Sequence, residues 1–178
     1  MIRLFTALPI PADISEALRP LQKGLSGASW RPVENFHITL RIFGNVSLEM
    51  AEDLDAAIAE IPVSSLELQL QGCGYFGRRE PRAVWARVNE NVHLHALSKA
   101  CERVARRIGL PAEKRPFRPH VTLAYCHGTP AEDAADYEAR HIGFSAGPWT
   151  ADRFHLYSSR LGNGPSRYVA EADYPMMP

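Results

Sequence analysis

Hydrophobic residues recur along this chain with two different periods, which predict a mixture of strands and helices. Leu66, Leu68 and Leu70 alternate with polar neighbours, as in a strand that buries one face. Between 92 and 108, apolar residues recur every three or four positions, as in an amphipathic helix. Over the whole chain, these periods predict strands at 2–8, 37–43, 66–71, 83–88, 115–126, 153–158 and 167–172, and helices at 11–25, 48–58, 92–108 and 132–139.

The order of these elements indicates an α+β fold in a single domain. Strands and helices alternate at first, and two strands end the chain, so we expect two antiparallel-rich sheets with outer helices and a central cleft. The domain, residues 1–178, divides into a first lobe of about 1–62 and a second of about 63–150. The long connection at 128–147 would let parts of the C-terminal hairpin return to the first lobe.

One short motif occurs twice, as His37-Ile38-Thr39-Leu40 and as His120-Val121-Thr122-Leu123. Because side chains alternate across a strand, the His and Thr of each copy share one face, and the apolar residues share the other. Two such polar faces opposite each other would place two imidazoles and two hydroxyls in one site. One basic and one protonated imidazole form an acid–base pair suited to attack and departure at phosphorus.

Two copies of this motif are unlikely to arise by chance. With seven histidines and five threonines, a random chain of this composition would contain about 0.2 His-x-Thr triplets. The alternative is a pair of ordinary strands whose solvent-facing sides happen to carry these residues.

The composition of the chain excludes several classes of function. The chain carries 20 basic and 20 acidic residues, so its formal net charge is zero and it lacks the broad basic field of non-specific nucleic-acid binders. Its three cysteines are widely spaced, which favours reduced thiols and a cytoplasmic location. No apolar run has the length of a signal peptide core or a membrane span, so we expect no membrane association.

The chain resembles the two-histidine phosphoesterase superfamily, and within it the LigT-like RNA 2′,3′-cyclic phosphodiesterases, also called 2′-5′ RNA ligases. The resemblance covers nearly the whole chain and is most specific at the two His-x-Thr motifs. The residues that carry it are the stretches 3–7, 30–41, 72–76, 84–85, 115–123 and 154–159, with Gly44, Gly164 and Tyr168.

This resemblance implies a bilobal fold and hydrolysis of a 2′,3′-cyclic phosphate to a 2′-phosphomonoester without a metal or another cofactor. It makes His37 the proton donor and His120 the proton acceptor, while Thr39 and Thr122 hold the phosphate oxygens. The partners it implies are RNA with a cyclic phosphate end or a nucleoside cyclic phosphate, and the reverse reaction would form 2′-5′ linkages. We expect the protein to act as a monomer.

The chain departs from the family at Tyr125, where a basic residue often stands two places after the second motif's Leu. In regular strands, Arg41 would share the face of His37, and Arg118 that of His120, so both are candidates for binding phosphate. Alternatively, they are solvated strand ends, and Pro119 disturbs the alternation. The aromatic candidates for stacking on a base, each also explained by a core or loop position, are Phe43, Tyr75, Phe76 and Trp85.

Two other functions compete with the phosphodiesterase. A non-catalytic module could bind RNA ends or phosphate through the same motifs, although Arg or Lys would serve such a module equally well. A metal-dependent phosphohydrolase would need a cluster of carboxylates beside the histidines, which the sequence lacks. Hydrolysis of a cyclic phosphate in excess EDTA distinguishes the three.

Overall fold

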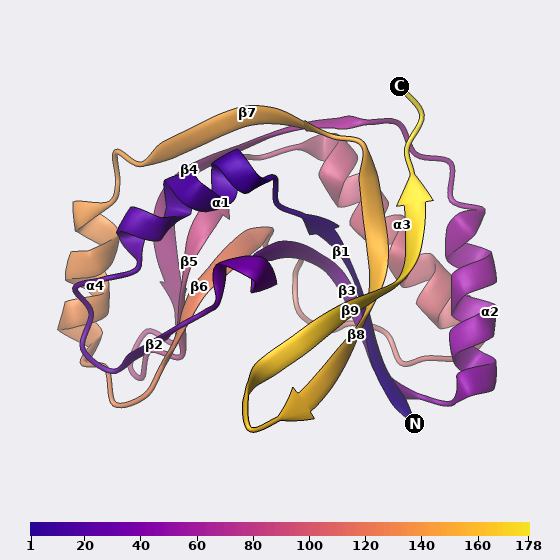
Figure 1. Ribbon diagram of the computed structural model, residues 1–178, viewed down its shortest axis with the longest axis horizontal. Helices are drawn as coiled ribbons and strands as arrows, with labels where there is room; N and C mark the ends of the chain where they lie inside the picture. The colour runs from indigo at the N-terminus through magenta and orange to yellow at the C-terminus, as the bar shows by residue number, and fades with distance from the viewer.

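The computed structural model of the protein covers residues 1–178 and contains two antiparallel sheets with helices packed against them (Figure 1). The first sheet has the order β3-β1-β8-β9, formed by His37–Val46, Ile2–Pro9, Arg153–Gly162 and Gly164–Pro175. The second has the order β2-β6-β5-β4-β7, formed by Ala28–Trp30, His120–Cys126, Ala83–Val88, Leu66–Phe76 and Ser145–Ala151. The predicted α+β class is confirmed.

Four α-helices accompany the sheets, and no helix is both long and apolar enough to cross a membrane. They are α1 (Ala12–Leu18), α2 (Leu48–Ala59), α3 (Val92–Ile108) and α4 (Ala131–Arg140). Helices α2 and α3 contact the first sheet and each other, while α4 contacts β4 of the second.

Capping residues set the ends of the two longer helices where the sequence predicts them. The Ser47 hydroxyl accepts a hydrogen bond from the Met50 amide at 3.1 Å and starts α2. The Asn91 side chain accepts two such bonds at the start of α3. Helix α3 ends at Gly109, whose φ of 104° suits a residue without a Cβ.

Other boundaries differ from the prediction because pairing between strands outweighs local turn signals. Strand β3 continues through Gly44 to Val46, and β4 continues to Phe76 through residues predicted as a loop. Strand β7 was not predicted at all. The predicted helix at 11–25 ends at Leu18, since Pro20 leads into the short 3-10 helix Arg19–Leu21.

The chain crosses between the sheets more often than a division at Pro62 allows. Strand β2 pairs with β6 in the second sheet, and the preceding segment is tied to α4 by bonds from Tyr137 to the Leu21 carbonyl and from Arg140 to the Gly24 carbonyl. The C-terminal hairpin β8–β9 returns to the first sheet and pairs with β1. Residues from about 21 to 30 therefore lie with the second lobe.

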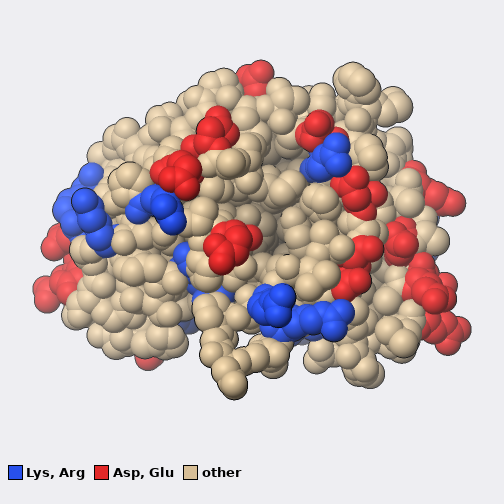
Figure 2. Space-filling model, in the orientation of Figure 1, with Lys and Arg blue, Asp and Glu red and all other residues tan.

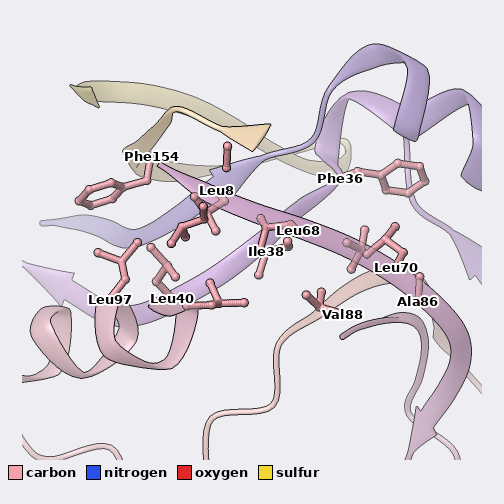
Figure 3. Close-up of a cluster of buried hydrophobic side chains, with 14 of the residues drawn as sticks. Leu8, Phe36, Ile38, Leu40, Leu68, Leu70, Ala86, Val88, Leu97 and Phe154 are labelled. Atoms are coloured by element: carbon pink, nitrogen blue, oxygen red, sulfur yellow. The ribbon is translucent and has the colours of Figure 1, made fainter. Parts of the chain in front are cut away.

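One hydrophobic core joins the two sheets. It contains 35 buried residues that form a single cluster. Figure 3 shows its centre, where side chains from both sheets and from α3 meet; those labelled are Leu8, Phe36, Ile38, Leu40, Leu68, Leu70, Ala86, Val88, Leu97 and Phe154. Because both sheets bury their inner residues against each other, neither lobe has a separate core.

We expect the two lobes to unfold together. Ile38 is fully buried in the shared core, so Ile38→Ala should lower the free energy of unfolding by about 3 kcal/mol. Ile42→Ala removes the same atoms from an exposed position on the same strand and should cost less than about 1 kcal/mol. Urea unfolding followed by tryptophan fluorescence and by circular dichroism should give one coincident transition. Two separate transitions would contradict a shared core.

Candidate active site

The two motif histidines are held in the same way by their own backbone. His37 is the first residue of β3, and its Nδ1 lies 2.7 Å from the carbonyl oxygen of Asn35. His120 is the first residue of β6, and its Nδ1 lies 2.6 Å from the carbonyl oxygen of Arg118. A carbonyl oxygen only accepts hydrogen bonds, so each Nδ1 carries a proton. In both neutral rings, Nε2 is therefore the nitrogen that lacks a proton.

The two motif strands meet where the sheets adjoin. Cα atoms of β3 and β6 approach within 8 Å of each other, although the strands belong to different sheets. The surface is hollowed near the middle of the face seen in Figure 2, on which Lys and Arg side chains form only small separate groups. The positive charge of His120 also lowers the pKa of His37, so the two imidazoles interact electrostatically.

Aromatic rings fix each imidazole from its own sheet. His37 packs against Phe5 and Tyr168, with ring centroids 5.1 and 5.2 Å away. His120 packs against Phe76 and Trp85 at 5.0 and 5.7 Å. Phe76 and Trp85 were candidates from the sequence for stacking on a base, but in the structure they contact the imidazole. Phe5 and Tyr168 were not identified as site residues, because their strands reach His37 only through tertiary pairing.

Gly74 makes room for this arrangement. It pairs with Trp85 across β4 and β5, and a Cβ at this position would lie 2.3 Å from the indole ring. The indole can lie across β4 only because no side chain occupies that place. Gly74 therefore helps to position the ring that supports His120.

Burial lowers the pKa of both imidazoles and so favours their neutral forms. It lowers the pKa of His37 to about 4, and the positive charges of His120 and Arg31 lower it further, against the bond to the Asn35 carbonyl. Burial also lowers the pKa of His120, against the bond to the Arg118 carbonyl. Since the shift is larger for His37, the first proton taken up by the pair goes mainly to His120.

The two motif threonines share the faces of their histidines. In the pairing of β3 with β1, Thr39 lies opposite Ala7 and His37 opposite Pro9. In the pairing of β6 with β5, Thr122 lies opposite Trp85 and His120 opposite Arg87. Both threonines are half-buried.

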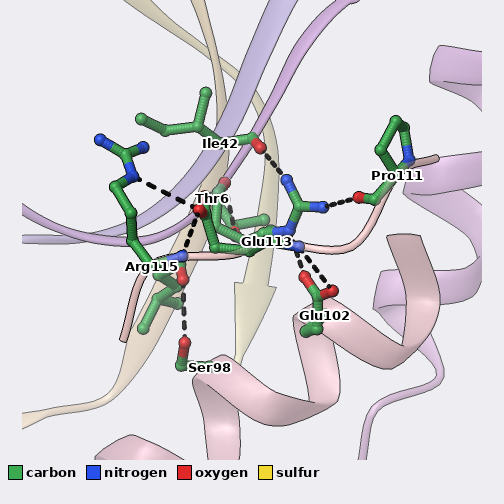
Figure 4. Close-up of polar contacts among 9 residues, drawn as sticks. Thr6, Ile42, Ser98, Glu102, Pro111, Glu113 and Arg115 are labelled. Carbon is green, nitrogen blue, oxygen red and sulfur yellow. Dashed lines mark hydrogen bonds and ion pairs between the residues drawn. The ribbon is translucent and has the colours of Figure 1, made fainter. Parts of the chain in front are cut away.

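The expectation that Arg41 faces the cleft is wrong. Thr6 pairs with Arg41 and Ala7 pairs with Thr39, so Leu40 is an extra residue that forms a β-bulge. The bulge turns Arg41 to the opposite face, where its side chain is buried. There it pairs with Glu102 and donates hydrogen bonds to the carbonyls of Ile42 and Pro111 (Figure 4).

The second motif contains a bulge at the corresponding leucine. Trp85 pairs with Thr122 and Val84 with Ala124, which leaves Leu123 as the extra residue. Beyond the bulge, Tyr125 returns to the face of Thr122, and its side chain is 43% exposed. The position where the family often has a basic residue thus lies on the polar side of the strand because of this bulge.

Arg118 does not follow strand alternation, because β6 begins two residues later. Its backbone carbonyl holds His120, while its side chain is exposed and forms no ion pair. Binding of phosphate by the Arg118 side chain remains a prediction.

No three His, Cys, Asp or Glu side chains gather at a spacing suited to a metal ion. The three cysteines, Cys73, Cys101 and Cys126, are all buried with free thiols. Burial raises the pKa of each thiol, so none has the character of an activated nucleophile.

Comparison with known proteins identifies the family. The model of the 2′-5′ RNA ligase superfamily matches residues 10–163, a stretch that contains both His-x-Thr motifs. The chain belongs to this superfamily. An RNA 2′,3′-cyclic phosphodiesterase of Archaeoglobus fulgidus is 29% identical over 90% of this chain and 92% of its own length. Another from Aeropyrum pernix is 39% identical, over 53% of this chain and 55% of its own length.

Solved structures of the superfamily share this fold. Escherichia coli LigT in complex with 3′-AMP superimposes with a TM-score of 0.80, at 25% identity and over 98% of both chains. The chain therefore has the bilobal fold of this superfamily, as the resemblance implied.

We expect Arg41 to matter for stability and not for catalysis. Arg41→Met leaves Glu102 without its partner and two carbonyls without a donor, which should lower the free energy of unfolding by about 3 kcal/mol. Arg115→Met, in the same region but highly exposed, should cost less than about 0.5 kcal/mol. Denaturant unfolding measures both free energies. The folded Arg41→Met protein should keep the wild-type kcat/KM, and a large loss of kcat/KM would show that Arg41 contributes to the active site.

The buried neutral His37 should make stability depend on pH. Its pKa is lowered on folding, so the unfolded chain binds the proton more tightly, and stability falls as the pH drops from about 6.5 to 4. Between those values, wild type should lose roughly 2 kcal/mol more than His37→Gln. His93→Gln, which changes an exposed histidine on α3, should behave as wild type. Equal pH dependence in all three proteins would show that His37 is not buried in its neutral form.

Proposed function

We propose that this protein hydrolyses the 2′,3′-cyclic phosphate of RNA ends or nucleosides to a 2′-phosphomonoester. The observation that carries the proposal is the matched pair of imidazoles on β3 and β6. Each has Nδ1 bonded to a backbone carbonyl and Nε2 left for proton transfer. Such a pair fits a reaction that needs one proton removed and one supplied at the same phosphorus.

The proposed step uses the two histidines in opposite roles. His120 Nε2 takes a proton from water, whose oxygen attacks phosphorus, and the bond from phosphorus to the 3′ oxygen breaks. His37 Nε2 gives its proton to that leaving oxygen, while Thr39 and Thr122 donate hydrogen bonds to the non-bridging oxygens. The same groups can act with a 5′ hydroxyl in place of water as the nucleophile: the bond from phosphorus to the 3′ oxygen breaks in the same way, and the product carries the 2′-5′ linkage named by the superfamily.

These roles require the substrate to move a proton between the imidazoles. Without substrate the first proton favours His120, whereas the proposed acid is His37. A phosphate anion raises the pKa of both, and it acts more strongly on the more deeply buried His37 because charges interact more strongly where water is excluded. Binding of the anion thus prepares the protonation state that the reaction needs.

The relatives support nucleotides as the substrate class. The Archaeoglobus fulgidus and Aeropyrum pernix proteins are both RNA 2′,3′-cyclic phosphodiesterases, and E. coli LigT has been solved with 3′-AMP. The zero net charge of this chain favours recognition of the RNA end over tracking of a long backbone. A module that only binds RNA ends would show affinity without turnover.

Hydrolysis of nucleoside 2′,3′-cyclic monophosphates in excess EDTA tests the function. We expect turnover with a bell-shaped dependence on pH and a product with its phosphate on the 2′ oxygen. His37→Ala and His120→Ala should each lower kcat by roughly 10²- to 10⁴-fold, and the double variant by less than the product of both losses. His93→Ala serves as the matched control. Near-normal turnover in either single variant would rule out the paired mechanism.

A substrate with sulfur in place of the bridging 3′ oxygen assigns the acid. A thiolate leaves without a proton, so this substrate should restore much of the lost rate in the variant that lacks the acid and none in the variant that lacks the base. We expect rescue of His37→Ala alone. Rescue of His120→Ala instead would reverse the two roles and leave the reaction unchanged.

A further inference from the structure

Arg31 lies at the junction of the two motifs. It follows β2, and its amide donates a hydrogen bond to the carbonyl of Leu123, the bulged residue of the second motif, at 2.8 Å. The Gln22 side chain donates to the carbonyls of both Arg31 and Leu123, at 2.8 and 3.2 Å. Six residues later the chain reaches His37. The backbone of Arg31 is therefore fixed to one motif and leads directly into the other.

The Arg31 side chain extends toward the same junction. Its guanidinium carbon lies 4.9 Å from the centre of the Tyr125 ring, in the geometry of a cation–π contact. It also lies close enough to Tyr168 to oppose the rise in the pKa of that hydroxyl, and Tyr168 packs edge-on against His37. Arg31 forms no ion pair with any carboxylate, so its charge is not neutralised within the protein.

We propose that Arg31 binds the phosphate of the substrate and that Tyr125 positions its guanidinium by stacking. The inference rests on the proposed function and names the residue that balances the phosphate charge at this site. A guanidinium can donate two parallel hydrogen bonds to the non-bridging oxygens. In this chain the positive charge comes from Arg31, directly after β2 of the same sheet, beside the position where the superfamily often has a basic residue.

The other arginines near the site are placed less well for this role. Arg41 is buried on the opposite face, and Arg118 precedes the strand. Arg87 shares the face of His120, but it stacks on Trp85 and donates to the Cys73 carbonyl. Besides His120, Arg31 is the cation whose charge reaches His37 and lowers its pKa.

This position gives Arg31 a second measurable effect. In the free protein the charge of Arg31 disfavours protonation of His37, so its removal should raise the pKa of His37. The acid limb of the kcat/KM profile, which reports the free enzyme, should then move to higher pH. Loss of a residue with a merely structural role would lower activity without moving this limb.

Four variants test the proposal: Arg31→Met, Arg31→Lys, the double variant Arg31→Met with Tyr125→Arg, and Arg19→Met as an exposed control. The measurements are kcat/KM with uridine 2′,3′-cyclic phosphate and the Kd of uridine 2′-monophosphate by calorimetry. We expect Arg31→Met to weaken both by about 10- to 100-fold, the usual range for losing charge-assisted hydrogen bonds. Arg31→Lys should recover part of the loss, and the control should stay within about twofold of wild type.

The double variant decides between charge and structure. If Arg31 supplies the positive charge that balances the phosphate, the added Tyr125→Arg change should raise kcat/KM at least tenfold above that of Arg31→Met. The proposal is overturned if Arg31→Met keeps the wild-type Kd and kcat/KM. It is also overturned if Arg31→Met loses activity, neither Arg31→Lys nor the double variant restores it, and the pH profile of kcat/KM does not move. If wild type hydrolyses no cyclic phosphate, the proposed function fails, and the calorimetry still decides the role of Arg31.

Discussion

The structure depends on the burial of the apolar backs of two strands. Ile38 and Leu40 on β3, and Val121 and Leu123 on β6, are at most 4% exposed, and they fill the core that joins the sheets. Because side chains alternate in a strand, a slip of one residue would bury the imidazoles and expose these aliphatic groups. Hydrophobic burial therefore fixes the register, and the register places His37 and His120 at the seam between the sheets.

The bulges at Leu40 and Leu123 modify that register where each strand leaves the site. Each adds one residue and reverses the alternation beyond it. In the first motif this reversal sends Arg41 into a structural cluster with Glu102. In the second it returns Tyr125 to the polar face, where its ring meets Arg31. The same local irregularity thus removes one cation from the site and provides a support for another.

Burying the two histidines lowers the stability of the folded protein at acidic pH, where the unfolded chain binds protons more tightly. Aromatic rings and burial hold the two imidazoles in place, and the same burial penalises their charged forms. Hydrogen bonds from Nδ1 to backbone carbonyls orient each ring and partly offset that penalty. Under the proposed function, the phosphate anion of the substrate raises both pKa values again and so permits proton transfer.

The sequence by itself determined the fold class, most elements, the bounds of α2 and α3 to within one residue, and the paired His-x-Thr motif, because these follow from local periodicity and residue chemistry. Tertiary structure decided the rest. The extension of β4, the crossing of β2 into the second sheet and the bulges arise from strand pairing between distant segments. The prediction from strand alternation put Arg41 on the wrong face, because the face depends on a bulge that appears only in the pairing with β1. Arg31 was overlooked because it meets Tyr125 only once β2 pairs with β6.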